Sequence, residues 1–198
     1  MEMEKFSNSL SVFIDDIENP VLQDSLKSLK KVVGDNIKIL DWGNGSIAIP
    51  LEINIDLPSL GNFENLDIRE IEPIVLVFNL INYPVSAPKV YTDRLDFPKN
   101  NLAHLYIAVN NRPPAFCYVR GNADEWYANK RIEDLVIRIS NWLRDAAIGE
   151  LTENGEQYEP LRLEGYSGSI IYDYDTILSV ITSAAAIQFG ESFAIALF

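Results

Sequence analysis

Cys117 is the only cysteine in the chain, and the residues around it favour chemistry at its thiol. It follows the paired prolines Pro113 and Pro114, and a proline-rich loop, Tyr83–Val90, precedes it in the sequence. A thiolate is both a nucleophile and a good leaving group, so it can accept an acyl group as a thioester and pass it on. We therefore expect Cys117 to be a thioester carrier, although a lone intracellular cysteine is often a small buried apolar residue.

An acyl carrier also needs a group that stabilises the oxyanion formed during transfer to an amine. A neutral hydrogen-bond donor, such as an amide or an imidazole, suits this purpose. The candidates near Cys117 in the sequence are His104, Asn110 and Asn111, which complete the candidate catalytic set. Each also has an ordinary interpretation, because histidine is often structural and asparagine often forms turns.

Composition and charge exclude several classes of function. The net charge of −13 over 198 residues disfavours nucleic acid and anionic lipid as main partners. A single cysteine excludes an intrachain disulfide. The first residues lack the pattern of a signal peptide, and no apolar run approaches the roughly 20 residues that span a bilayer. We expect a cytoplasmic protein.

No cofactor or metal is expected. One histidine and one cysteine are poor material for a zinc site. Residues 43–45, Gly-Asn-Gly, form a turn signal without the strand-to-helix context of a phosphate-binding loop.

Two helices are predicted before the first strand. Apolar residues at helical spacing indicate a helix over residues 6–18, and a second helix is predicted over residues 20–33. Asn19 can cap the second helix, Pro20 suits its first position, and Gly34 can end it.

Four strands are predicted next: Ile37–Trp42, Ile49–Ile55, Ile74–Leu80 and Lys89–Thr92. No crossover helix separates them, so the sheet is expected to be a four-stranded antiparallel meander. From residue 93 to residue 130 prolines, glycine and asparagines interrupt any period, which predicts a long irregular segment.

Helical order returns over Arg131–Leu143, with an apolar stripe that continues through two alanines to a stop at Gly149. The predicted fold class is α+β, with a domain over residues 1–150. Residues 151–198 are expected to form a linker and a C-terminal extension, in which residues 161–198 carry mixed strand and helix signals.

The proline-rich loop resembles a known motif. Tyr83–Val90 is similar to the Tyr-Pro-x-x-Pro-Pro-x-Val loop of ubiquitin-conjugating enzymes, with Ala87 in place of the first paired proline. In that family the active cysteine follows about thirty residues later and a tryptophan about eight after it. Here Cys117 lies 29 residues after Pro88, and Trp126 lies 9 residues after Cys117.

The resemblance covers roughly residues 19–150 and looks closest to bacterial relatives, which often have a histidine before the cysteine and Trp-Leu in the following helix. His104 and Trp142-Leu143 match that description. The His-Pro-Asn tripeptide of the eukaryotic enzymes is absent, and Cys117 lies 13 residues after His104. Neither Asn110 nor Asn111 occupies the position of the motif's asparagine.

The resemblance implies a conjugating-enzyme fold and a place in a bacterial ubiquitin-like conjugation pathway. Cys117 would receive a ubiquitin-like modifier from an activating enzyme and transfer it to an amine. The resemblance also implies a deubiquitinase-like peptidase as a possible further partner, sometimes in antiviral defence.

Two alternatives remain open. The chain could be a non-catalytic module of the same fold that binds a ubiquitin-like partner, with Cys117 serving only in packing. It could also be a structural or immunity-type protein without a link to ubiquitin, which a buried and slowly reacting Cys117 would favour.

Overall fold

The computed structural model describes residues 11–57, 59, 62–63, 66–99, 102–106 and 113–151. They belong to the first of the chain's two units, residues 1–164. Apart from Leu151, the expected C-terminal extension over residues 151–198 lies outside the described residues and stays a prediction.

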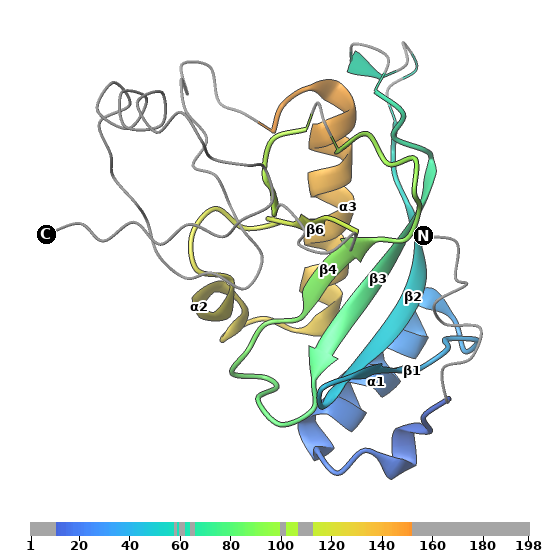
Figure 1. Ribbon diagram of the computed structural model, residues 1–198, viewed down its shortest axis with the longest axis vertical. Helices are drawn as coiled ribbons and strands as arrows, with labels where there is room; N and C mark the ends of the chain where they lie inside the picture. The colour runs from blue at the N-terminus through green and yellow to red at the C-terminus, as the bar shows by residue number, and fades with distance from the viewer. Residues whose placement is uncertain are drawn as a thin grey trace, which may run out of the picture. The chain divides into compact units, whose positions relative to one another are not determined.

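The helix predicted over residues 20–33 is confirmed as α1, Pro20–Val33 (Figure 1). Asn19 caps it, because its side-chain oxygen accepts hydrogen bonds from the amides of Val21 and Leu22, each at 3.1 Å. Gly34 ends it with a φ of 101°. The buried side of α1 consists of leucines: Leu22, Leu26 and Leu29.

The helix predicted over residues 6–18 is wrong where the chain is described. Ser11 forms a β-bridge with Leu40, and only a short 3₁₀ helix follows, η2 at Ile14–Asp16. The apolar residues here do not share one face, since Ile17 is buried whereas Phe13 is 71% exposed. Helical spacing without a common buried face was therefore a misleading signal.

The four predicted strands form, the first three with shifted ends, and lie side by side as antiparallel neighbours. They are β1 (Leu40–Gly43), β2 (Ser46–Asn54), β3 (Ile71–Asn79) and β4 (Lys89–Thr92). Asn44 and Gly45 connect β1 to β2 with φ values of 53° and 68°, as a two-residue hairpin turn requires.

The described sheet has six strands rather than four, and this corrects the predicted meander. Two short strands, β5 (Leu105–Tyr106) and β6 (Ala115–Phe116), extend the order to β1-β2-β3-β4-β6-β5. Strands of two residues are too short to produce an alternating pattern in the sequence. The segment predicted to be irregular also contains a short helix, α2, at Ala123–Tyr127.

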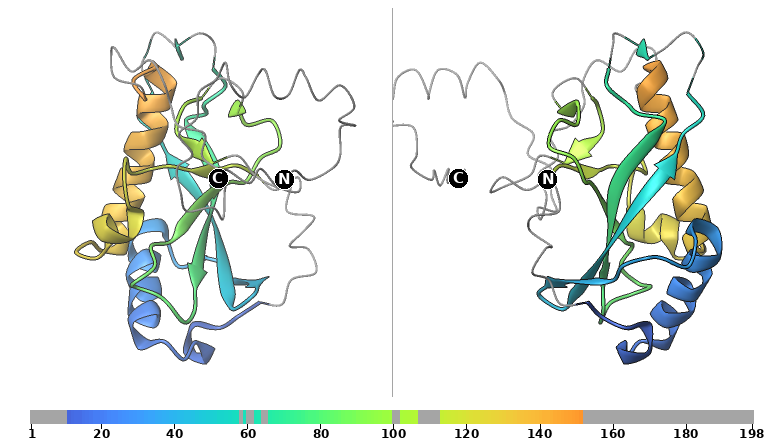
Figure 2. Two further views of the ribbon diagram at one scale, coloured as in Figure 1. Left: turned by 60° about the vertical axis from the view of Figure 1, so that its left-hand side comes forward. Right: turned by 90° about the vertical axis from the view of Figure 1, so that its right-hand side faces the viewer.

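The last predicted helix is confirmed as α3, Ile132–Ile148, and Gly149 ends it with a left-handed φ of 77°. Figure 2 shows that α1 and α3 cover the same face of the sheet. The main core lies between these helices and that face. It is built from side chains of α1, β2, β3 and α3, including Leu26, Ile49, Leu76, Ile139 and Leu143.

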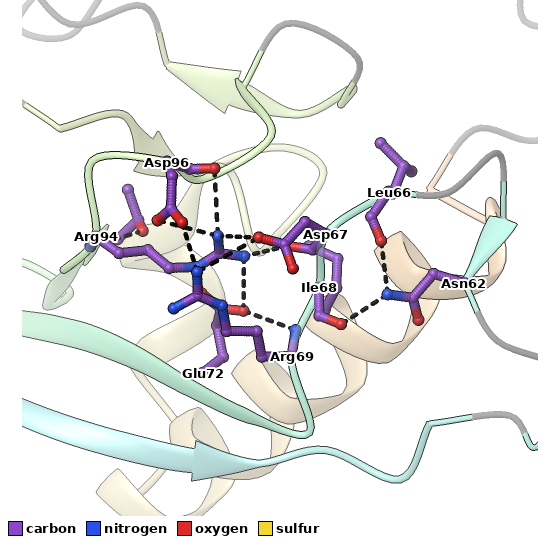
Figure 3. A network of polar contacts seen from close by, with 9 residues as sticks. Asn62, Leu66, Asp67, Ile68, Arg69, Glu72, Arg94 and Asp96 are labelled. Carbon is purple, nitrogen blue, oxygen red and sulfur yellow. Dashed lines mark hydrogen bonds and ion pairs between the residues drawn. The ribbon is translucent and has the colours of Figure 1, made fainter.

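A buried ion pair joins β3 to the segment after β4 (Figure 3). The Arg94 guanidinium donates to the Glu72 carboxylate at 2.5 and 3.1 Å, and both side chains are almost fully buried. Asp67 accepts a further hydrogen bond from Arg94 at 2.7 Å. Burial alone would lower the pKa of Arg94, but its hydrogen bonds and ion pairs with these carboxylates raise the pKa above its ordinary value.

Candidate active site

Cys117 lies directly after β6 and its side chain is enclosed, with the residue only 4% exposed. Its sulfur donates a hydrogen bond to the main-chain carbonyl of Val119 at 3.2 Å. Its amide donates to the carbonyl of His104 at 2.8 Å. The thiol thus sits at the end of a strand, with both its main chain and its sulfur held in the described state.

His104 lies opposite Cys117 across the β5–β6 pair. Leu105 pairs with Phe116, so the same antiparallel register places the residue before β5 beside the residue after β6. His104 is buried, and its φ of 58° interrupts the extended backbone. The structure therefore brings these two predicted residues together through their main chains. Asn110 and Asn111 lie outside the described residues.

The proline-rich loop between β3 and β4 contacts the cysteine segment directly. The hydroxyl of Tyr118, the residue after the thiol, donates to the carbonyl of Pro88 at 2.8 Å. Burial, followed by the nearby Asp124, Tyr106 and Cys117, raises the pKa of Tyr118 well above its usual range. Tyr118 therefore remains a neutral donor, which suits a structural tie between the two segments.

The other side of the same loop is fixed to α1 and α2. The Tyr83 hydroxyl donates to the Ser25 hydroxyl at 2.8 Å and shares a second hydrogen bond with the Tyr127 hydroxyl, also at 2.8 Å. The Asp124 carboxylate accepts from the amide of Ala87 at 2.7 Å. Asp124 therefore helps to hold the loop.

Asn19 adds a third attachment of the loop. While its oxygen caps α1, its side-chain nitrogen donates to the carbonyls of Tyr83 at 2.8 Å and Leu80 at 3.2 Å. One amide side chain thus binds the start of α1 to both ends of the turn after β3.

Aromatic packing supports β6, the strand that directly precedes the thiol. Phe116, the residue before Cys117, stacks on Trp142 of α3 with ring centroids 4.5 Å apart and an interplanar angle of 14°. The Phe116 ring also lies near that of Phe97, with centroids 5.4 Å apart, and the Arg94 guanidinium lies 5.3 Å from the centroid of the Phe97 ring. Trp142 is a core residue.

Two arginines that the sequence did not single out attach the segment after the thiol to other parts of the chain. Arg138 of α3 donates from Nε to the carbonyl of Tyr118 at 2.5 Å. Arg120 donates from Nη2 to the carbonyl of Leu151 at 2.8 Å. Charged residues on the polar side of a helix or in a loop are usually solvated, so neither position carried a signal in the sequence.

The described residues contain no group of three or more histidine, cysteine, aspartate or glutamate side chains that could hold a metal ion. None of the helices in the described ranges is long and apolar enough to cross a membrane.

Comparison with known proteins identifies the family. The family model described as prokaryotic E2 family A matches residues 51–177, which include the proline-rich loop, Cys117 and all of α3. The chain therefore belongs to prokaryotic E2 family A, and this membership supports a general role in ubiquitin-like conjugation, with transferase activity. No curated protein and no solved structure matches the chain.

The matched region differs from the region covered by the sequence resemblance. It begins within β2, so α1 precedes it, and it continues beyond the expected domain end at residue 150. Residues 152–177 thus belong to the stretch that the family shares, although they lie outside the described residues.

Proposed function

We propose that Cys117 carries a ubiquitin-like modifier as a thioester in a bacterial conjugation pathway. The observation that carries the proposal is the position of the thiol. The chain's only cysteine lies within the family match, at the end of β6 and beside a loop held by α1, α2 and Tyr118. A fixed setting of this kind suits a residue that must meet two protein partners in turn.

The proposed cycle consists of two acyl transfers. In the first, the Cys117 thiolate attacks the thioester between an activating enzyme and the carboxyl end of the modifier; a new carbon–sulfur bond forms and the activating enzyme's thiolate leaves. In the second, an acceptor amine attacks the Cys117 thioester, the carbon–sulfur bond breaks, and an amide forms. The amine loses a proton, and Cys117 leaves as a thiolate.

The oxyanion of the second step requires a hydrogen-bond donor. We assign this role to the group formed by His104, Asn110 and Asn111. His104 is supported by its position, since its main chain lies directly against that of Cys117. The paired prolines, Pro113 and Pro114, would keep the approach to the thioester rigid and exclude water.

The test is the formation of a thioester. The chain, its cognate activating enzyme, the modifier and ATP should yield an adduct that a reductant cleaves, and Cys117→Ala should abolish it. Cys117→Ser should trap an oxyester that resists the reductant. As a matched control, Ser140→Ala, which alters a hydroxyl on α3 that donates to the carbonyl of Asn54, should form the adduct normally. Failure of the wild-type chain to form an adduct with its cognate pair would refute the carrier role.

The burial of Cys117 favours a second candidate, a non-catalytic module that binds a ubiquitin-like partner. Under this alternative the wild-type chain and Cys117→Ala bind the modifier with equal affinity, and neither forms an adduct. Binding measured by calorimetry, together with the adduct assay, separates the two functions.

A further inference from the structure

The three residues Val119–Gly121 lie between two fixed points of the chain. Before them, Tyr118 is held by its hydroxyl at Pro88 and by its carbonyl at Arg138. After them, Asn122 caps α2, and its side-chain oxygen accepts from the amides of Asp124 at 2.9 Å and Glu125 at 3.4 Å. The segment between is therefore short and its ends are anchored.

Val119 contacts the thiol directly. Its carbonyl accepts the hydrogen bond of the Cys117 sulfur, and its side chain packs against the main core. A reagent or a protein thioester must approach the sulfur of Cys117 closely, but only 4% of this residue is exposed. The sulfur must therefore be uncovered before it reacts.

Arg120 attaches the segment Val119–Gly121 to the end of α3, and Gly121 gives its backbone a point at which it can turn. The exposed Arg120 reaches across 31 positions of sequence to the carbonyl of Leu151, which is buried just after the end of α3. Gly121 has a φ of 111°, a conformation that residues with a Cβ rarely adopt, and glycine has the widest choice of backbone conformations at which the segment can turn.

We propose that Val119–Gly121 forms a lid over the Cys117 thiol and that the hydrogen bond from Arg120 to the Leu151 carbonyl keeps it closed. Opening breaks this bond and the bond between the thiol and Val119, while Tyr118 and Asn122 stay in place. The geometry implies that opening controls the reactivity of the thiol. The further statement, that opening precedes loading with a modifier, rests on the proposed function.

The test is the rate at which Cys117 reacts with iodoacetamide in the folded chain. Because the chain has one cysteine, the modification reports on this site alone. Arg120→Ala should react about tenfold faster than the wild type, as expected for the loss of one charge-assisted hydrogen bond. The matched control is Arg144→Ala, which removes an exposed arginine of α3 paired with Asp145 and should leave the rate unchanged. Equal rates for both variants would overturn the proposal.

A second measurement needs no variant. Opening of three residues exposes little surface, so the wild-type alkylation rate should hardly change with urea below the unfolding transition. If the rate instead rises with urea as steeply as the equilibrium constant for global unfolding, the thiol is reached only by unfolding and the lid does not exist. This test holds even if Arg120→Ala fails to fold.

The lid and the carrier function fail in different ways. Alkylation requires neither an activating enzyme nor a modifier, so the rates decide the lid alone. A faster reaction of Arg120→Ala, together with no thioester in the wild type, would support the lid and refute the carrier. A thioester in the wild type, with no effect of Arg120→Ala on alkylation, would support the carrier and refute the lid.

Discussion

The hydroxyl oxygens of Tyr83 and Tyr127 lie 2.8 Å apart in the buried space between the proline-rich loop and α2. Their rings are also in contact, with centroids 5.9 Å apart. The loop before β4 and the helix after Cys117 are therefore joined by a hydrogen bond between segments 44 positions apart in sequence. This link places the two segments that flank the thiol in one rigid arrangement.

Tyr83→Phe should lower the free energy of unfolding by about 1 kcal/mol, because it removes the hydroxyl that bridges Ser25 and Tyr127. Tyr127→Phe should cost a similar amount. Urea denaturation of the two single variants and the double variant measures the coupling. The double variant should lose less than the sum of the single losses, and strict additivity would show that the bond contributes nothing.

Tyr127 should make the fold sensitive to alkaline pH. Burial, together with the hydrogen bond to Tyr83, raises the pKa of Tyr127 well above its ordinary value near 10. The unfolded chain then loses this proton first, so stability is level below about pH 10 and falls as the pH rises further. Unfolding free energies measured between pH 8 and 11 should decline less steeply for Tyr127→Phe. Identical slopes would contradict the prediction.

Asp93 should make the stability of the fold depend on pH in the acidic range. Burial raises the pKa of this carboxyl to about 6, above its unfolded value near 4. Its contribution to stability is therefore present below about pH 4 and lost as the pH rises through 6. Asp93→Asn should match the wild type near pH 3.5 and exceed it near pH 7.5 by about 1 kcal/mol, once partial exposure is taken into account. A gain that is the same at both pH values would rule out titration as the cause.

Replacing only one partner of the Glu72–Arg94 ion pair should destabilise the fold strongly, because the other charge stays buried without it. Glu72→Gln leaves the Arg94 charge buried with weaker partners, and the unfolding free energy should fall by about 3 kcal/mol. The double replacement Glu72→Leu/Arg94→Met should cost less than the sum of its single replacements. The control is Asp96→Asn, at an exposed partner of Arg94, which should change stability little.

Asn19 allows capping to be separated from the attachment of the loop. Asn19→Asp keeps the oxygen that caps α1 but loses the nitrogen that donates to the carbonyls of Leu80 and Tyr83. It should cost about 1–2 kcal/mol, and Asn19→Ala, which loses both functions, should cost about 1 kcal/mol more. Equal losses in urea denaturation would show that the two functions are not separable.

The elements with local signals were predictable. Asn19, Pro20 and Gly34 define α1 by their own conformational preferences, and Gly149 ends α3 in the same way. The two-residue strands β5 and β6 were not predictable, because a strand needs several residues to show alternation. Their formation depends on tertiary contacts such as the pairing of Tyr91 with Ala115.

The sequence could propose the residues of the candidate site, but it could not predict that the thiol is buried. The spacing from Pro88 made Cys117 a candidate, and the structure places the main chain of His104 beside it; the catalytic roles of both residues stay predictions. The hydrogen bond that we propose closes the lid joins Arg120 to Leu151, which are 31 positions apart, and no local pattern encodes such a contact. The buried pair of Glu72 and Arg94 escaped prediction for the same reason, since charged side chains usually face solvent.

The enclosure of Cys117 also bears on how the chain withstands oxidants. Sulfur oxidation to sulfinic or sulfonic acid is irreversible in most proteins, and its rate depends on how exposed the sulfur is. With 4% of the residue exposed and no second cysteine to provide a protective disulfide, burial is the means by which this chain can preserve its thiol. We expect the resting chain to survive peroxide exposure that would inactivate a carrier with an open sulfur.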